Sequence, residues 1–181
     1  MSTEHKISIP IPKGVTLSLK GSNLSAKGPL GQVTRKFPAA AIDLKVSGST
    51  AEIDLSLPPR RKNVAILDTW EKHIINMMLG VTKGFVAKAK MVSAHFPMKV
   101  YEKDGFVVIE NFLGEKYPRR SPLLGTTKVE VAGEELFFSG IDLESVGQSV
   151  ANMEKTTHIR NYDPRVFQDG IYITEKAHPK E

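Results

Sequence analysis

Cysteine is absent from this chain of 181 residues. Disulfide bonds and thiol catalysis are therefore excluded, and the absence is compatible with a reducing compartment. Long apolar runs are absent as well, because no stretch approaches the roughly 18 apolar residues that a membrane-spanning helix needs. The early segment Ile7–Pro12 is too short and too interrupted by proline to be the core of a signal peptide. The sequence therefore predicts a cytoplasmic protein with no membrane partner.

Motifs for catalysis, metal binding and cofactor binding are also missing. The five histidines are scattered, and none stands at metal-ligand spacing to another histidine or to a carboxylate. The chain has neither a Walker loop nor a Gly-x-Gly-x-x-Gly motif, and Ser121 and Ser139 lack the context of a nucleophile elbow. We therefore expect no catalytic residue, no metal site and no cofactor.

Positive charge is in mild excess. The chain has 25 Lys+Arg against 20 Asp+Glu, a formal net charge of +5, which favours an anionic partner without identifying one. The excess lies in the first half, because residues 1–83 carry 12 Lys+Arg against 6 Asp+Glu, whereas residues 84–181 carry 13 against 14. Any anion-binding surface in the second half must therefore come from local clustering of cations.

Two segments have the periodicity of amphipathic helices. Apolar residues recur at three- and four-residue steps between Val64 and Leu79, and the same spacing returns between Leu143 and Lys155. Asp142 precedes the second segment and is a suitable N-cap. Most of the remaining chain alternates apolar and polar residues as β-strands do, with glycine-rich turns between the runs.

The order of these elements repeats along the chain. Leu30–Gly31 recurs 83 residues later as Leu113–Gly114, and Val46–Gly48 corresponds to Val131–Gly133. Each half then closes with an amphipathic helix. The sequence therefore predicts an α+β protein with two tandem duplicated domains, each a small, mostly antiparallel sheet packed against one helix. We expect the domains over residues 1–83 and 84–174, followed by a flexible tail over residues 175–181.

Basic clusters are the candidates for contact with phosphates. They are Arg60–Lys62 before the first helix; Lys88 and Lys90 on one strand face; Lys116, Arg119 and Arg120 in a loop between prolines; and Arg160 and Arg165 after the second helix. Forked arginine donors suit phosphates. Each cluster is also compatible with an ordinary solvated surface, and the strand lysines are compatible with the protection of a sheet edge.

Polar and aromatic residues after the second helix suit contacts to RNA bases and sugars. Asn161 and Gln168 offer amide groups to 2′-hydroxyls or base edges, and Tyr162 offers a ring for stacking. We interpret Phe167 and Tyr172 as core residues and Asp169–Gly170 as a hairpin turn, in which glycine supplies the backbone angles.

Three segments together resemble the motifs of one family. They are His73–Phe85 at the domain boundary, Asn111–Lys116 with Pro118–Arg119, and Arg165-x-Phe167-x-Asp169-Gly170-Ile171-Tyr172-Ile173-x-x-Lys176. In this order, and over nearly the whole chain, they resemble the archaeal/eukaryotic branch of the large-subunit ribosomal protein number six family. The resemblance implies two tandem copies of one α+β fold and a structural role in the large ribosomal subunit without catalytic activity.

The resemblance also implies partners and a location. It implies binding to large-subunit ribosomal RNA (rRNA), mainly through the second domain, near the stalk base, the factor-binding region and the sarcin–ricin loop. Neighbouring ribosomal proteins are the implied protein partners, with translational GTPase factors close by. Together with the charge pattern it gives these expected RNA contacts: Lys88, Lys90, Lys116, Arg119, Arg120, Arg160, Asn161, Arg165, Gln168 and Lys176. The alternative is a protein–protein interaction module whose duplicated sheets offer edges to partners.

Overall fold

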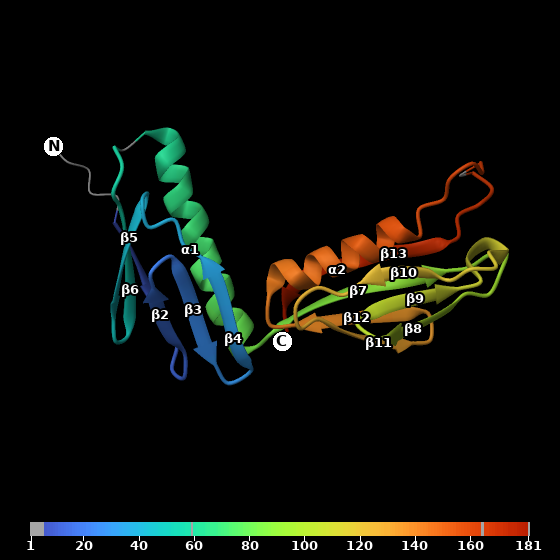
Figure 1. Ribbon diagram of the computed structural model, residues 1–181, viewed down its shortest axis with the longest axis horizontal. Coiled ribbons are helices and arrows are strands. Elements are labelled where there is room, and N and C mark those ends of the chain that lie inside the picture. The colour runs from blue at the N-terminus through green and yellow to red at the C-terminus, as the bar shows by residue number, and fades with distance from the viewer. Residues whose placement is uncertain (1–5, 59, 164, 181) are drawn as a thin grey trace. The chain divides into compact units, whose positions relative to one another are not determined.

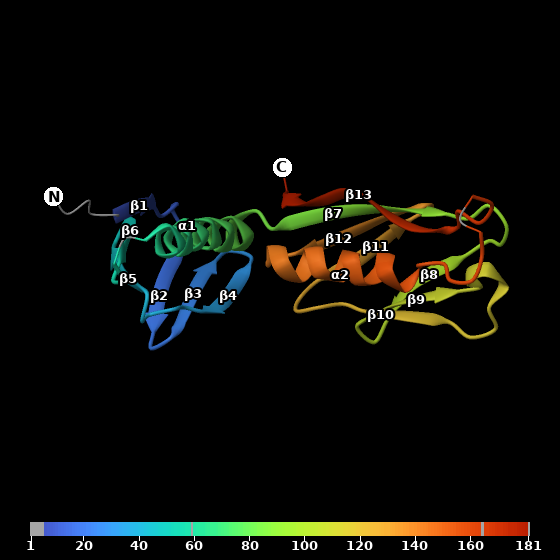
Figure 2. The same cartoon turned by 90° about the horizontal axis from the view of Figure 1, so that it is seen from above.

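The structure is a computed structural model that describes residues 6–58, 60–163 and 165–180. It consists of two compact units that divide between Lys83 and Gly84 (Figures 1 and 2). All strand pairs in the described residues are antiparallel.

Unit 1 contains two three-stranded sheets and one long helix. The first sheet has the order β1 (Lys6–Pro10), β6 (Thr50–Leu55) and β5 (Ile42–Ser47), and the second has the order β2 (Thr16–Lys20), β3 (Asn23–Gly28) and β4 (Gly31–Lys36). Helix α1 (Arg61–Thr82) packs against strands of both sheets.

The predicted apolar stripe of α1 forms the core of unit 1. Leu67, Trp70 and Ile74 are buried, and Phe37 packs edge-on against the ring of Trp70 with the ring centroids 5.0 Å apart. A glycine is needed where β3 meets the helix, because a Cβ on Gly28 would lie 2.7 Å from Val81 atoms. The helix extends three residues beyond the predicted segment at each end. The first extension, Arg61–Asn63, is polar and adds no apolar residue to the stripe, whereas the second begins at Gly80, a residue typical of helix ends, and adds the buried Val81.

Unit 2 has a larger sheet, a smaller sheet and one helix. The larger sheet has the order β11 (Lys128–Ala132), β12 (Glu135–Gly140), β7 (Phe85–Val92) and β13 (Gly170–Pro179), and the smaller has the order β10 (Arg119–Pro122), β9 (Phe106–Glu110) and β8 (Lys99–Lys103). A short 3₁₀ turn, Phe112–Gly114, joins β9 to β10. Helix α2 (Leu143–Thr156) packs against both sheets, and the Asp142 carboxylate accepts the Ser145 N–H at 3.1 Å as the predicted N-cap.

The two units repeat strand by strand. The sheet order β1-β6-β5 of unit 1 corresponds to β7-β12-β11 of unit 2, and β2-β3-β4 corresponds to β8-β9-β10. Helix α1 corresponds to α2 in the same way, at the end of each series of strands. Strand β13 has no counterpart among the described strands of unit 1 and pairs with the remaining edge of β7. The arrangement confirms the predicted α+β class with two duplicated domains.

Strand β13 contradicts the prediction of a flexible tail for residues 175–180, whereas position 181 lies outside the described residues. The strand continues to Pro179, which lies opposite Phe85 of β7, and the Lys180 N–H donates to the Gly84 carbonyl at 3.0 Å. The register shifts on both sides of Glu175 interrupt the alternation of apolar and polar residues. The sequence pattern therefore does not predict this part of β13, whose partner is the first strand of the unit.

Candidate nucleic-acid interface

Three loops meet at one end of unit 2, beyond the ends of β7, β9 and α2 (Figure 1). We call this region the loop end, and its described residues are 93–98, 111–118, 157–163 and 165–169. Side chains connect the loops. The Asn111 amide donates to the Pro97 carbonyl at 3.0 Å and joins the second loop to the first. Arg119 joins the second loop to the end of α2, and Asp169 joins the third loop to the first. Segments that are distant in the sequence therefore form one surface.

Arg119 holds the middle loop against the end of α2. Its guanidinium donates to the Glu115 carboxylate at 2.6 and 2.8 Å and to the Thr156 carbonyl at 2.7 Å, and its Cζ lies 4.1 Å from the centre of the Phe112 ring. The hydrogen bond from Arg119 lowers the pKa of Glu115. The last carbonyls of a helix have no partner within it, so Arg119 satisfies one of them. Most donors of this predicted RNA contact are thus used inside the protein.

Asp169 joins the first loop to the last. Its buried carboxylate accepts the Ala94 N–H at 2.6 Å, the His95 N–H at 3.0 Å and the His95 ring Nδ1–H at 2.6 Å. Burial acts to raise the pKa of Asp169, but the hydrogen bonds from His95 and Ala94 outweigh burial and the pKa is lowered. The predicted hairpin turn at Asp169–Gly170 is therefore wrong, because Asp169 is a buried anchor and Gly170 begins β13.

Tyr172 is exposed, contrary to its prediction as a core residue. The residue retains 45% of its accessible surface, while the preceding Ile171 is buried, as expected for alternate positions of a strand. The Tyr172 hydroxyl donates to the Gln168 carbonyl at 3.1 Å. The ring lies so close to Gly170 that a Cβ there would stand 3.2 Å from ring atoms. Gly170 therefore allows the ring to fold back along the chain.

Five of the ten predicted RNA contacts are exposed together at the loop end. They are Lys116, Arg160, Asn161, Arg165 and Gln168. Arg165 bonds to Asp163 at 3.1 Å and lowers the pKa of that carboxyl, yet the Arg165 side chain is 89% exposed and open to a ligand. An exposed pair of this kind adds little stability and is easily exchanged for another anion.

Aromatic rings are exposed on the same surface. Tyr117 retains 78% of its accessible surface and Tyr162 retains 51%. Tyr162 packs on Phe167 with the ring centroids 4.7 Å apart, and Phe167 packs at the same centroid distance on His95. Tyr117 is not among the contacts predicted from the sequence, although its place between Lys116 and Pro118 in a basic loop is a signal for base stacking.

The remaining candidates lie on strands, outside the three loops, and Lys90 and Arg120 are close to the loop end because Lys90 pairs with Tyr172 and β10 begins at Arg119. Lys88 is in the middle of β7 with its Nζ 2.9 Å from Glu175, and Lys90 Nζ is 3.7 Å from Glu134. The two lysines share one face as predicted, but the sheet-edge interpretation is wrong because β7 lies between β12 and β13. Lys176 is exposed toward the far end of β13, and Arg120 is exposed on β10.

Two classes of site receive no support from the part of the chain that the structure describes. Its helices are not long and apolar enough to cross a membrane. No three of its histidine and acidic side chains are grouped so that they could hold a metal ion.

The model of the family described as ribosomal protein L6 matches residues 11–84 and, a second time, residues 97–170. The chain belongs to the ribosomal protein L6 family. The two matches fall on units 1 and 2, so the ribosomal protein L6 domain is present twice. This confirms the resemblance that the three sequence motifs indicate, and it confirms the prediction that the protein is not an enzyme.

Relatives in the ribosomal protein L6 family are similar over nearly the full length. Large ribosomal subunit protein uL6 of Methanosarcina mazei is 45% identical over 98% of this chain and 100% of its own. The protein of the same name from Methanobrevibacter smithii is 44% identical over 93% of this chain and 94% of its own. That of Archaeoglobus fulgidus is 40% identical over 93% and 88%, respectively.

Proposed function

We propose that this protein is a structural constituent of the large subunit of the cytoplasmic ribosome and binds large-subunit rRNA through the loop end of unit 2. Full-length similarity to proteins named for the large ribosomal subunit supports the first part. The observation that carries the second part is the convergence of three loops that expose cations, amides and aromatic rings on one surface.

Charge pairing explains how an acidic unit can attract RNA. Unit 2 has 13 Lys+Arg against 14 Asp+Glu, but the carboxylates at the loop end are engaged. Glu115 is bonded to Arg119, Asp163 to Arg165, and Asp169 to His95. Lys116 and Arg160 are exposed beside them, so the local field at this surface is more positive than the unit as a whole.

The chemistry of the loop end suits folded RNA. The deep, narrow major groove of an A-form helix hides its base edges, so cations and amides contact phosphates and 2′-hydroxyls instead. Exposed tyrosines add faces on which unpaired bases can stack. The surface is thus matched to an RNA junction or loop that presents both a backbone and unstacked bases.

A salt titration tests this function. Affinity for a large-subunit rRNA transcript is measured between about 50 and 200 mM salt, a range that resolves phosphate contacts. The double variant Arg160→Gln/Arg165→Gln should reduce the slope of log K against log salt by about 2, because each cation that no longer reaches a phosphate removes about 1 from the slope. The control Lys103→Gln/Lys128→Gln removes the same charge from exposed strand positions away from the loop end. An equal change in both would contradict a local site, and unchanged affinity in both would favour the protein-interaction module.

The resemblance supports a finer location, near the stalk base, the factor-binding region and the sarcin–ricin loop. It also supports neighbouring ribosomal proteins as partners and translational GTPase factors close by. Ultraviolet crosslinking of intact large subunits, followed by mapping of peptides and RNA, tests this location. Crosslinks from the loop end to an rRNA site remote from these regions would contradict it.

A further inference from the structure

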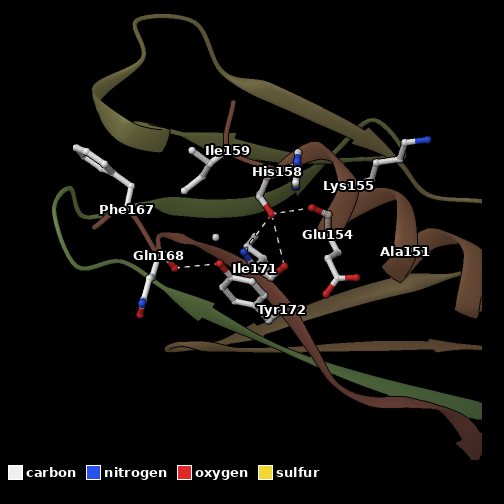
Figure 3. A pocket seen from close by; sticks show the side chains of 11 residues that line it. Ala151, Glu154, Lys155, His158, Ile159, Phe167, Gln168, Ile171 and Tyr172 are labelled. Atoms are coloured by element: carbon white, nitrogen blue, oxygen red, sulfur yellow. Dashed lines mark hydrogen bonds between the residues drawn. The ribbon is translucent and has the colours of Figure 1, made fainter. Parts of the chain in front are cut away.

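A pocket of about 470 Å³ opens at the loop end, between the last turn of α2 and the first residues of β13 (Figure 3). Its volume lies within the range of sites for small organic ligands. Ile171 is buried in its wall, and the Tyr172 ring and the Glu154 side chain border the same space (Figure 3). The pocket therefore combines an apolar surface with an aromatic ring and a carboxylate.

Hydrogen bonds fix the shape of this pocket. The Thr157 hydroxyl accepts the Ile171 N–H at 3.1 Å and donates to the Glu154 carbonyl at 3.0 Å, which joins the end of α2 to the start of β13. The hydroxyl of Tyr172 is held on the Gln168 carbonyl. A ligand would enter a preformed site, so little binding free energy would be lost in ordering it.

We propose that the pocket receives one unpaired guanine of the bound RNA, an inference that rests on the proposed function. One oxygen of the Glu154 carboxylate accepts the Ile173 N–H at 3.1 Å, and a carboxylate has acceptor capacity for further donors. Guanine presents two adjacent donors on its Watson–Crick edge, N1–H and the N2 amino group. Adenine, cytosine and uracil each place an acceptor beside their donor, which the carboxylate would repel. The exposed ring of Tyr172 offers a face for stacking.

Basic side chains near the pocket suit the phosphate of such a nucleotide. Lys155 and His158 are among the residues that line the pocket and are exposed, and Arg160 follows closely along the chain. Removing a base from a paired stack is costly, whereas a base that is already unpaired enters without that cost. The expected occupant is therefore a guanine in a bulge or loop.

Nuclear magnetic resonance titrations of the full chain test the proposal. The probes are GMP, AMP, CMP, UMP and ribose 5-phosphate. We expect GMP to shift the amide signals of Ile171, Tyr172 and Ile173 in a saturable manner, with affinity about tenfold higher than the other nucleotides, as for a paired set of base-edge hydrogen bonds. Glu154→Gln should remove this preference, because its amide donor faces a guanine donor. Glu130→Gln, at an exposed acid on β11, is the matched control.

A second variant tests the pocket without changing Glu154, whose carboxylate also bonds to the Ile173 N–H. Tyr172→Leu alters an exposed side chain and should weaken GMP binding through loss of stacking. Equal shifts from ribose 5-phosphate and GMP would mean that only the phosphate binds, at the basic side chains near the pocket, and would overturn the guanine site. So would the absence of any shift in a protein that still binds rRNA in a salt-dependent way, while the proposed function would stand. If the unmodified chain does not bind rRNA, the proposed function is overturned and, with it, this inference.

Discussion

At the scale of single residues, identical side chains that are adjacent in the sequence serve different ends. Arg119 turns inward to Glu115 and the end of α2, whereas Arg120 points outward from the next position of β10. Strand alternation separates them, and nothing in the sequence indicates which arginine faces which way until the register of β10 on β9 is known. Charge alone therefore groups an arginine that is bonded inside the protein with one that is exposed.

Substitution of this pair should separate stability from binding. Arg119→Gln should lower the free energy of unfolding of unit 2 by about 2–3 kcal/mol, because it breaks charged hydrogen bonds to Glu115 and a bond to a helix-terminal carbonyl. Arg120→Gln should change stability by less than about 0.5 kcal/mol, as at most exposed sites, and weaken rRNA binding. Urea unfolding followed by tyrosine fluorescence measures unit 2, since all four tyrosines lie there, while the single tryptophan, Trp70, reports unit 1. Equal stabilities of the two variants would contradict the role of Arg119 in holding the middle loop against the end of α2.

Asp169 should make the stability of unit 2 depend on pH. Its pKa is lowered in the folded state, so its stabilising effect is complete above the unfolded pKa of about 4 and is lost as the pH falls through the folded pKa below that value. Asp169→Asn should cost about 2–3 kcal/mol at pH 7, because the buried donors of Ala94 and His95 lose a charged acceptor. The difference between wild type and variant should shrink as the pH drops from about 5 toward 2, the range over which an acid with a lowered pKa titrates. Parallel curves over this range would show that Asp169 does not titrate as described.

At the scale of elements, local patterns predict local structure well. The stripe of Leu67, Trp70 and Ile74 identifies α1, the Asp142 cap locates the start of α2, and glycine turns locate the hairpins. What the sequence does not reveal is pairing over long distances. β13 joins β7 across the whole of unit 2, and Asp169 meets His95 because these two strands are neighbours. The loop end is therefore predicted as separate basic segments, and only the sheet order brings them together.

Removal of the last part of β13 tests whether these residues stabilise unit 2 as part of the strand. Truncation after Thr174 should destabilise unit 2 by about 2–4 kcal/mol, because it removes several backbone hydrogen bonds to β7 and the Lys180–Gly84 bond. The control Glu175→Gln breaks the exposed ion pair with Lys88 and keeps the strand, so its cost should stay below about 1 kcal/mol. Tyrosine-detected urea unfolding, with Trp70 as the internal reference for unit 1, measures both. A truncated chain as stable as the full one would mean that the strand contributes nothing.

At the scale of the whole molecule, net charge and the proposed binding surface fall in different halves. Residues 1–83 carry a net charge of +6 and residues 84–181 a net charge of −1, yet the surface that combines exposed cations, amides and rings, the loop end, belongs to unit 2. Unit 2 also differs from its repeat by one added strand among the described residues, β13, which begins at the loop end. The two units are thus similar scaffolds, and the strand that is added to unit 2 begins at the proposed binding surface.

This separation predicts that the affinity for rRNA depends more on the cations of the loop end than on the net charge of either unit. The triple variant Arg60→Gln/Arg61→Gln/Lys62→Gln removes an exposed cluster at the start of α1 and half of the net charge of unit 1. It should weaken binding to the large-subunit rRNA transcript less than Arg160→Gln/Arg165→Gln does, although it removes more charge. The reason is that a cation in contact with a phosphate releases a condensed counterion, whereas a cation that contacts no phosphate contributes only a screened field, with a Debye length of about 10 Å at 0.1 M salt. Dissociation constants of both variants over the same salt range decide the matter. A larger loss in the unit 1 variant would move the principal RNA contact to unit 1.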